Sequence, residues 1–347
     1  MHPDQTQKKK VLEEIQRPLN TRSTTVQWLN RQTVDVAEQR LWDIMVHNIA
    51  AYKKLIEYVG SLPPELRMVR LGSDVLPVYT QRDWAYYWQQ PDVVAYCERE
   101  LAKVGDTARL LDVRLSMHPG QFTVLASDNP EIVDRSIEEF EYHTDVIRYM
   151  GYGKTFQDFK CNVHISGRNG PAGIKAALKR LSTEARNTIT IENDENKWGI
   201  ADSLELADDL ALVLDVHHTW CREGEYLSPK SDEFKRMIDS WRGVRPAIHY
   251  SYSRDTALPE GFAHNTMPNF PALLEAGHKK AKLRAHSDWY PNPAVNEYAL
   301  SFLEHADIMC ESKMKNLASI KLYEFWKRSK EPVSTILESK AHAPAYA

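Results

Sequence analysis

A short β-rich run that ends in a histidine or a carboxylate recurs along this chain, and the pattern limits the folds open to it. At residues 114–118 such a run delivers His118, and Pro119 and Gly120 then break it. Later runs end in the same kinds of side chain, at His164, at Glu192, at Asp215 with His218, at His249 and at Glu311. A (β/α) barrel gathers its functional side chains at the carboxyl ends of successive parallel strands. The pattern therefore predicts a barrel with a polar site at its mouth.

Helical periodicity separates these runs. Apolar residues recur at three- and four-residue steps in 34–59 and again in 128–151, and strand and helix go on alternating up to a closing helix near 317–327. We therefore predict an α/β fold, specifically a TIM-type (β/α) barrel with an atypical or missing first strand. The predicted parts are an N-terminal extension, a single barrel domain, a surface loop within it and a C-terminal tail, at 1–33, 34–330, 255–271 and 331–347.

The composition fits a globular protein from a reducing compartment. Its 4 cysteines are scattered and form no Cys-x-x-Cys pair. The chain has no apolar run of about 18 residues, and its first ten residues lack the apolar segment of a secretory signal. We expect a soluble, non-secreted, cytoplasmic protein with no membrane contact and no obligatory protein partner. Its net charge of -4 means that any nucleic-acid contact must come from local basic residues.

The residue types at the run ends are those of a metal centre. The candidate ligands are His118, His164, Glu192, Asp215, His218, His249, His286 and Glu311. Imidazole suits Zn, Mn and Fe, whereas carboxylates favour harder cations, so a mixed set without thiolates indicates Mn or Zn. Eight ligands are too many for one ion. A carboxylate such as Glu192 can bridge two ions about 3.5 to 4 Å apart, the arrangement that serves phosphodiester cleavage.

Each candidate also has a structural explanation, because a single histidine at a strand end is more often hydrogen-bonded than metal-bound. Chance, however, rarely ends six consecutive runs in ligand-type residues, so we expect a metal-dependent enzyme. Asp194, His217 and Asp288 are weaker candidates. If a strand runs through both His217 and His218, alternation lets only one of them face the metals.

Several of these segments together resemble the UV damage endonucleases, relatives of endonuclease IV among the xylose-isomerase-like barrels. The resemblance rests on residues 117–122 (Met-His-Pro-Gly-Gln-Phe), 191–194 (Ile-Glu-Asn-Asp), 214–218 (Leu-Asp-Val-His-His), 248–251 (Ile-His-Tyr-Ser) and 309–313 (Met-Cys-Glu-Ser-Lys), in that order. It extends from about Gly72 to Lys313. It implies incision of double-stranded DNA immediately 5' of helix-distorting lesions such as ultraviolet photoproducts and abasic sites.

The resemblance also implies roles for individual residues. His118, His164 and Glu192 would hold one ion; Glu192, Asp215, His249 and Glu311 would hold a second; and His218 with His286 would hold a third. We thus expect two or three divalent ions, with Mn as the first choice and Zn as the second. Glu192, His118 and Glu311 are the predicted catalytic residues.

Four residues are predicted to handle the DNA. Gln121 and Phe122 stand where the family uses glutamine and an aromatic residue to probe the duplex at the lesion, as an inserted wedge does. Arg168, in a glycine-rich loop after the His164 run, and Lys313, just after Glu311, are candidate phosphate contacts at the barrel mouth.

The chain departs from the family pattern in three places. No histidine follows the Ser73-Asp-Val-Leu-Pro77 segment, where residues 78–81 read Val-Tyr-Thr-Gln. Ala247 stands where the family carries a lysine close to the metals. The opening strand has no clear counterpart in residues 1–20. Two alternatives therefore stay open: a sugar isomerase or epimerase, which uses the same barrel and a similar ligand set, and a catalytically impaired DNA-binding relative.

Overall fold

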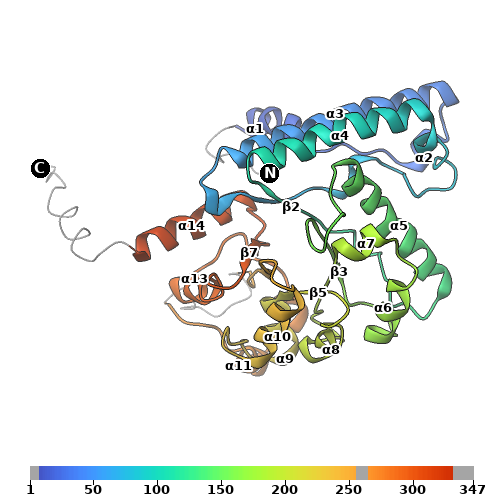
Figure 1. Ribbon diagram of the computed structural model, residues 1–347. Helices are drawn as coiled ribbons and strands as arrows, with labels where there is room; N and C mark the ends of the chain where they lie inside the picture. The colour runs from blue at the N-terminus through green and yellow to red at the C-terminus, as the bar shows by residue number, and fades with distance from the viewer. Residues whose placement is uncertain (1–7, 255–264, 331–347) are drawn as a thin grey trace, which may run out of the picture.

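The computed structural model describes residues 8–254 and 265–330, and every structural statement below concerns these residues. Seven parallel strands form one sheet in sequence order and curve into a nearly closed barrel (Figure 1). The strands are β1 (Met68–Arg70), β2 (Arg114–Met117), β3 (Lys160–His164), β4 (Ile189–Glu192), β5 (Ala211–Asp215), β6 (Ala247–Tyr250) and β7 (Asp307–Cys310). The predicted TIM-type barrel is confirmed. The predicted tail at 331–347 and residues 255–264 of the predicted loop lie outside the described residues.

Helices connect the strands and cover the outside of the barrel (Figure 1). The α-helices are α1 (Lys9–Gln16), α2 (Val26–Leu29), α3 (Val34–Gly60), α4 (Pro91–Leu110), α5 (Pro130–Tyr149), α6 (Gly170–Leu178), α7 (Thr183–Thr188), α8 (Ile200–Leu204), α9 (Val216–Glu223), α10 (Asp232–Ser240), α11 (Phe270–Glu275), α12 (Lys280–Leu283), α13 (Pro293–Leu300) and α14 (Asn316–Lys330). Short 3-10 helices are η1 (Arg17–Leu19), η2 (Pro64–Leu66), η3 (Ser73–Val75) and η4 (Tyr87–Gln89).

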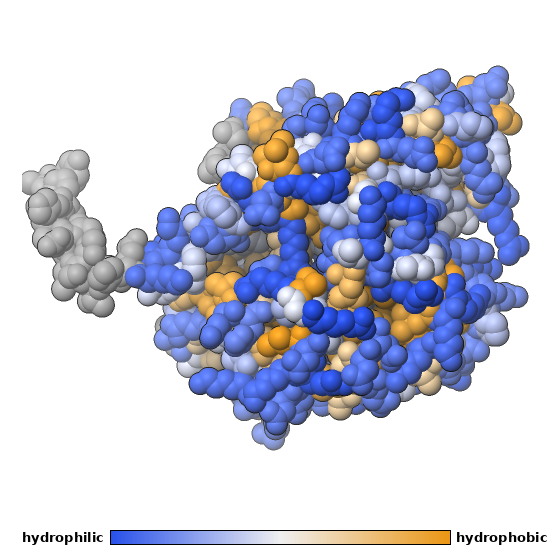
Figure 2. All heavy atoms as spheres, viewed as in Figure 1, coloured by the Kyte–Doolittle hydropathy of each residue, from blue (hydrophilic) through white to orange (hydrophobic). Residues whose placement is uncertain are grey.

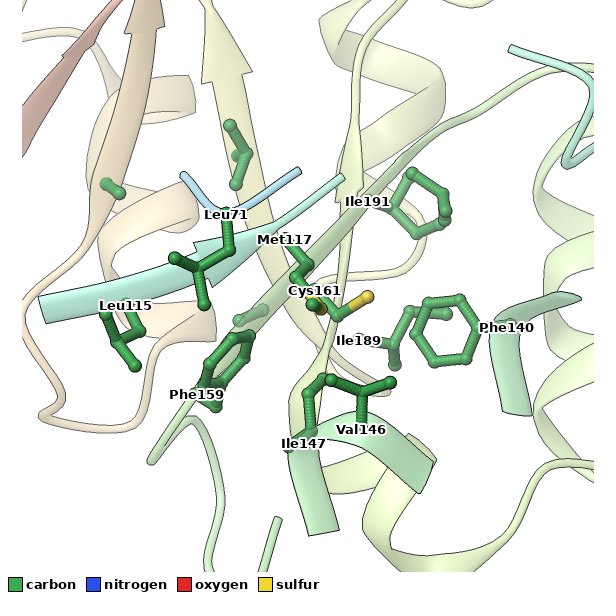
Figure 3. Close-up of a cluster of buried hydrophobic side chains, with 14 of the residues drawn as sticks. Leu71, Leu115, Met117, Phe140, Val146, Ile147, Phe159, Cys161, Ile189 and Ile191 are labelled. Carbon is green, nitrogen blue, oxygen red and sulfur yellow. The ribbon is translucent and has the colours of Figure 1, made fainter. Parts of the chain in front are cut away.

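The alternation of side chains along each strand separates the core from the site. Cys161 of β3 and Ile189 and Ile191 of β4 lie among the apolar side chains of α5, including Phe140 and Val146 (Figure 3). Because successive strand residues point to opposite faces, the intervening polar residues point to the barrel interior. This periodicity carries the residues at the strand ends to the mouth of the barrel.

The barrel begins at β1, and within the described residues β1 and β7 do not pair with each other. The gap between these two strands is the open seam of the barrel. Cavities of about 470 and 350 Å³ adjoin the seam, and both are lined by Met68, Met309 and Cys310. Residues of α14 line the seam as well, and an ion pair of 2.6 Å between Arg70 Nη1 and Glu311 Oε1 crosses it at the mouth. The expectation of an atypical or missing first strand therefore holds for the described chain, whose N-terminal part is helical instead.

A buried amide helps to fasten the helical N-terminal part to the barrel. The Asn48 side chain of α3 accepts a hydrogen bond from Arg22 N at 2.7 Å and donates to the carbonyl oxygens of Arg22, Asp74 and Val75. It thereby joins the N-terminal segment to the turn that follows β1. Among the described residues, no helix combines the length and the apolar character needed to cross a bilayer.

The run predicted to end at Asp215 with His218 is a strand only as far as Asp215, for a local reason. β5 ends at Asp215, whose carboxylate Oδ1 accepts hydrogen bonds from the backbone N–H of His217 and His218, both at 2.8 Å. An aspartate at this position is a strong helix N-cap, so α9 begins at once. The two histidines therefore lie on a helix, and the argument from strand alternation does not apply to them.

The packing of α4 against the end of α5 gives a stability prediction. A Cβ atom at Gly105 would overlap the backbone oxygen of Met150, which cannot move aside as a flexible side chain can. We expect Gly105→Ala to lower the free energy of unfolding by about 1 to 3 kcal/mol, the usual range for overpacking. Urea unfolding measures this. Gly120→Ala is the matched control, because nothing lies within 4 Å of its added Cβ; equal stability of the two variants would contradict the packing.

Candidate metal centre

Seven of the eight predicted ligands make up three overlapping groups at the barrel mouth that could hold metal ions. The groups are His118 with His164 and Glu192, then Glu192 with Asp215 and His218, and then Asp215 with His249 and Glu311. Within each group the ligand atoms lie within 4.8 Å of one another. Glu192 and Asp215 each belong to two groups. The arrangement is therefore one continuous centre with two shared carboxylates.

Glu192 is the middle of the centre and is fully buried at the end of β4. One carboxylate oxygen, Oε2, accepts a hydrogen bond from the Asn162 side chain, which Thr190 orients by donating to its Oδ1 at 2.8 Å. The other oxygen, Oε1, lacks a hydrogen bond of regular geometry within the described residues. Burial tends to raise the pKa of Glu192, but His249 and His164 outweigh it and hold the pKa well below the usual value. Glu192 is thus an ionised carboxylate with one oxygen to offer.

The two carboxylate oxygens of Asp215 also differ in their hydrogen bonds, as those of Glu192 do. Oδ1 caps α9, while Oδ2 is buried without a hydrogen-bond partner among the described residues. Burial raises the pKa of this carboxyl, because removing a charge from water without a full set of partners is costly. A cation beside Oδ2 would remove that cost.

His249 presents its Nδ1 atom to the same space. Nδ1 lies 3.1 Å from Glu192 Oε1 and 3.3 Å from Glu311 Oε1, and on the far side of the ring Nε2 lies 2.9 Å from Lys160 Nζ. Burial lowers the pKa of His249 to about 4 and that of Lys160 to about 7. When Nδ1 binds a metal, Nε2–H must donate to a neutral Lys160 amine, and the lowered pKa makes that amine form available near neutrality.

His118 and His164, the two ligands that form a group with Glu192, come from neighbouring strand ends. His118 follows β2 and His164 ends β3, and their ring centroids are 5.0 Å apart. His118 Nδ1 lies 2.9 Å from the Pro119 carbonyl oxygen, to which it can donate, so Nε2 faces Glu192 Oε2 at 3.5 Å. A histidine that donates one ring N–H to a carbonyl and offers the other nitrogen is typical of metal ligands.

The spacings fit bound ions. Ligand atoms at about 2.0 to 2.2 Å from one ion lie roughly 3.0 to 3.6 Å from each other in octahedral or tetrahedral geometry. The separations of 3.5, 3.1 and 3.3 Å between His118 and Glu192, His249 and Glu192, and His249 and Glu311 fall in this range. The unpartnered buried oxygens and the mixed imidazole and carboxylate donors fit a divalent cation such as Mn or Zn.

His286 lies apart from the three groups. Its Nδ1 is 2.9 Å from the backbone oxygen of Glu311, and its ring contacts that of His217 at 6.0 Å between centroids. His217 is buried and stacks on Trp220, which indicates a packing role. Of the weaker candidates, Asp194 accepts hydrogen bonds from the backbone N–H groups of residues 196–198 and shapes the turn after β4.

The predicted DNA-handling residues lie on the surface. Phe122 is 85% exposed, and Gln121 beside it is exposed too. Arg168 is exposed and pairs with Asp128, with Nη1 3.2 Å from Oδ2. Lys313 is also exposed, two residues after Glu311.

Three residues of the centre escaped the sequence reasoning. They are Lys160, Arg70 and Glu195, which contact His249, Glu311 and His218, respectively. Lys160 left a signal, because a lysine inside a buried strand is rare unless it has a partner. Nothing in the sequence marks Arg70 or Glu195, since charged residues are common near strand ends.

Comparisons with known proteins identify the family of this chain. The family model of the UV-endonuclease UvdE matches residues 8–340. The chain belongs to the UV-endonuclease UvdE family. A UV DNA damage endonuclease of Bacillus thuringiensis subsp. konkukian is 23% identical over 311 residues, which cover 87% of this chain and 86% of the relative. The UV-damage endonuclease of Neurospora crassa is 29% identical over 212 residues, which cover 56% of this chain and 31% of the longer relative.

A solved structure shows the same fold. The crystal structure of SacUVDE superposes with a TM-score of 0.67 at 21% sequence identity, covering 90% of this chain and 94% of that chain. The family model confirms the resemblance inferred from the motifs, and among the described residues the barrel mouth is where histidines and carboxylates lie close enough together to hold metal.

The protonation of the centre gives a prediction about metal binding. Burial tends to lower the pKa of His218, but Asp215, Glu192 and Glu195 outweigh it and raise the pKa to about 9. A protonated imidazole cannot bind a metal, so protons compete with ions below this pH. We expect Mn²⁺ affinity to rise as pH increases from about 7 to 9, with proton release.

Isothermal titration calorimetry in buffers of different ionisation enthalpy measures both the affinity and the protons released. His305→Gln is the control, because His305 is exposed and outside the centre and should leave the pH slope unchanged. An affinity that does not change across this pH range would contradict the assignment of His218 to the centre.

Proposed function

We propose that this protein is a metal-dependent endodeoxyribonuclease that repairs DNA by incising the phosphodiester 5' of ultraviolet photoproducts and of other helix-distorting or abasic lesions. The observation that carries the proposal is the chain of three His/carboxylate groups joined by Glu192 and Asp215 at the mouth of the barrel. Membership of the UV-endonuclease family supports the reaction and the DNA substrate. We propose that two or three divalent ions serve it, Mn in preference to Zn.

The side chains define how the ions would be held. His118, His164 and Glu192 would bind one ion, and Glu192, Asp215, His249 and Glu311 would bind the second. Divalent ions in such a pair supply binding of the scissile phosphate, activation of water at neutral pH and stabilisation of the departing oxygen. The protein contributes the fixed geometry: Asn162 orients Glu192, Lys160 orients His249 and Arg70 orients Glu311. No side chain need act as a covalent nucleophile, and the products would carry 3'-hydroxyl and 5'-phosphate ends.

The surface beside the centre suits a duplex with a distorted base pair. Exposed Phe122 borders a cavity of about 820 Å³ whose lining includes Arg82 and Arg135. An aromatic side chain that stands out beside an open cavity can enter a distorted stack while a displaced base takes the cavity. The face of the molecule drawn in Figure 2 is covered mainly by hydrophilic residues, with apolar residues in patches between them. Gln121, Arg168 and Lys313 are proposed as further contacts to the DNA.

The two alternatives left open by the sequence differ in what they require. A sugar isomerase or epimerase needs a closed pocket around a small substrate, whereas Phe122 and its cavity lie open at the surface, and the family match favours the nuclease. A DNA-binding relative without activity would bind irradiated DNA in Mn²⁺ and leave it uncut. One assay separates these cases.

The assay is nicking of supercoiled plasmid by the metal-loaded protein, with and without prior ultraviolet irradiation. We expect Mn²⁺-dependent nicking of irradiated plasmid, and near-total loss of it in Glu192→Gln, because the amide removes the charge of the shared ligand. Circular dichroism of the variant should show a retained fold. Equal nicking of both plasmids would remove the lesion specificity, and no nicking by the wild type would remove the nuclease proposal.

The proposed role of Phe122 predicts a change in discrimination. Stacking of an aromatic side chain on a base contributes about 1 to 3 kcal/mol, which corresponds to roughly 5- to 150-fold in a rate constant. We expect Phe122→Ala to lower kcat/KM on an irradiated oligonucleotide within this range, with unchanged metal content. Leu110→Ala is the matched control, since Leu110 is 84% exposed at the far end of α4. If Phe122→Ala kept the wild-type kcat/KM, the ring would make no contact that the reaction depends on.

A further inference from the structure

A run of closely spaced cations lies in the segment that leads from β6 toward β7. Four of the six residues 279–284 are Lys or Arg, and no residue between Glu275 and Asp288 is acidic, although the net charge of the chain is -4. We propose that these four cations, together with Lys197, hold the DNA duplex on the 5' side of the incised bond. The inference rests on the proposed function, because it names a surface that binds the same substrate. The five residues form the basic rim: Lys197, Lys279, Lys280, Lys282 and Arg284.

The chain that leaves β6 fixes this run at the barrel mouth. Just after β6, the carbonyl of Tyr252 accepts a hydrogen bond from the backbone N–H of Ser287 at 2.6 Å. The N–H of Arg254 donates in turn to the Ala285 carbonyl at 3.0 Å. Leu283 of α12 is fully buried and anchors the helix. The cations of α12 therefore have a fixed place at the carboxyl end of β6, at the same end of the barrel as the metal centre.

The basic rim continues onto the turn after β4. Arg284 Nη1 lies 3.7 Å from Glu195 Oε1 and also donates to the Asn196 side chain. Lys197 follows on the same turn, and its Nζ donates to the Arg168 carbonyl at 3.1 Å. Arg168, on the loop after β3, is already a proposed DNA contact. Cations from three loops are thus joined along one side of the mouth, from α12 to the loop after β3.

Most of the charge on the basic rim is unpaired. Among the described residues, the run 279–284 makes a single ion pair, that of Arg284 with Glu195. Lys279 and Lys282 are exposed. A typical protein surface mixes both signs of charge, whereas lysines without carboxylate partners on a fixed segment suit phosphate oxygens. Such contacts release the counterions of DNA, so the affinity that they provide falls as salt rises.

The order of the strands places α12 across the mouth from Phe122. Phe122 follows β2 and α12 follows β6, four strands farther on in a barrel of seven. The metal centre lies between them, since its ligands come from the ends of β2 to β7. With the lesion at Phe122 and the cut bond at the centre, the incised strand continues in the 5' direction toward α12. The basic rim therefore holds the flank 5' of the cut rather than the lesion.

Binding of shortened duplexes tests this direction. Each duplex carries one ultraviolet photoproduct and a non-hydrolysable linkage in place of the bond that is cut. One duplex extends a full helical turn to both sides, one stops just 5' of the bond, and one stops just 3' of the lesion. Fluorescence anisotropy with the Mn²⁺-loaded protein gives the Kd of each duplex over a series of salt concentrations.

The test variant is Lys279→Gln with Lys282→Gln, because both side chains are exposed. We expect this variant to bind the full duplex and the 3'-shortened duplex roughly tenfold more weakly than the wild type at low salt, with a salt slope of log K reduced by about 0.9 for each lost phosphate contact. On the 5'-shortened duplex it should match the wild type, because the phosphates that the two lysines contact are missing there.

The matched control is Lys175→Gln with Lys179→Gln, which removes the same charge at the other end of the barrel. Lys175 Nζ lies 3.4 Å from Asp209 Oδ2, just before β5 begins. This control should bind all three duplexes as the wild type does. The inference would be overturned by an equal loss on all three duplexes, by no loss on any of them, or by the same loss in the control. A protein that shows the expected flank dependence but never nicks irradiated plasmid would remove the proposed function and leave the basic rim standing.

Discussion

The buried charge of Glu192 is the constraint on which the rest of the barrel mouth depends. A carboxylate taken out of water loses hydration worth on the order of several kcal/mol, and only partners at close range restore it. Here one oxygen has the Asn162 amide and the other has neighbouring imidazoles but no hydrogen bond of regular geometry. Asp215, likewise buried, is in the same position at its Oδ2. A fold that keeps two half-satisfied carboxylates beside four histidines has the groups that could hold cations, because a cation would satisfy all of these atoms together.

The open seam of the barrel bears directly on this centre. β1 and β7 face each other without pairing in the described chain, yet Glu311, at the end of β7, must keep its place for His249. Arg70, from the end of β1, reaches across to Glu311, and at the opposite end of the barrel Arg114 Nη1 binds Asp307 Oδ2 at 2.5 Å. Ion pairs from β1 and β2 to β7 and its end thus help to hold the last strand in place where backbone pairing with β1 is absent from the described residues.

The residues that the sequence could predict are those whose position follows from local periodicity. His118, His164, Glu192, His249 and Glu311 all lie at or just after strand ends, where strand alternation fixes the side they face. The course of the chain after Asp215 was harder to predict, because this residue is the last of a strand and its side chain caps the helix that follows at once. Lys160, Arg70 and Glu195 could not be assigned in advance, since their partners are distant in sequence and their roles depend on which strand ends meet in space.

Lys160 shows how a physical requirement can be met from a different position. The family pattern leads one to expect a lysine at 247, where this chain has a buried alanine beneath His249. Lys160 extends from β3 across the interior and places its Nζ 2.9 Å from Nε2 of that histidine. A ring that offers Nδ1 to a metal needs an acceptor for its Nε2–H, and a buried amine with a pKa lowered to about 7 can supply one. What the centre requires is therefore an acceptor at this point in space, and more than one strand of the barrel can provide it.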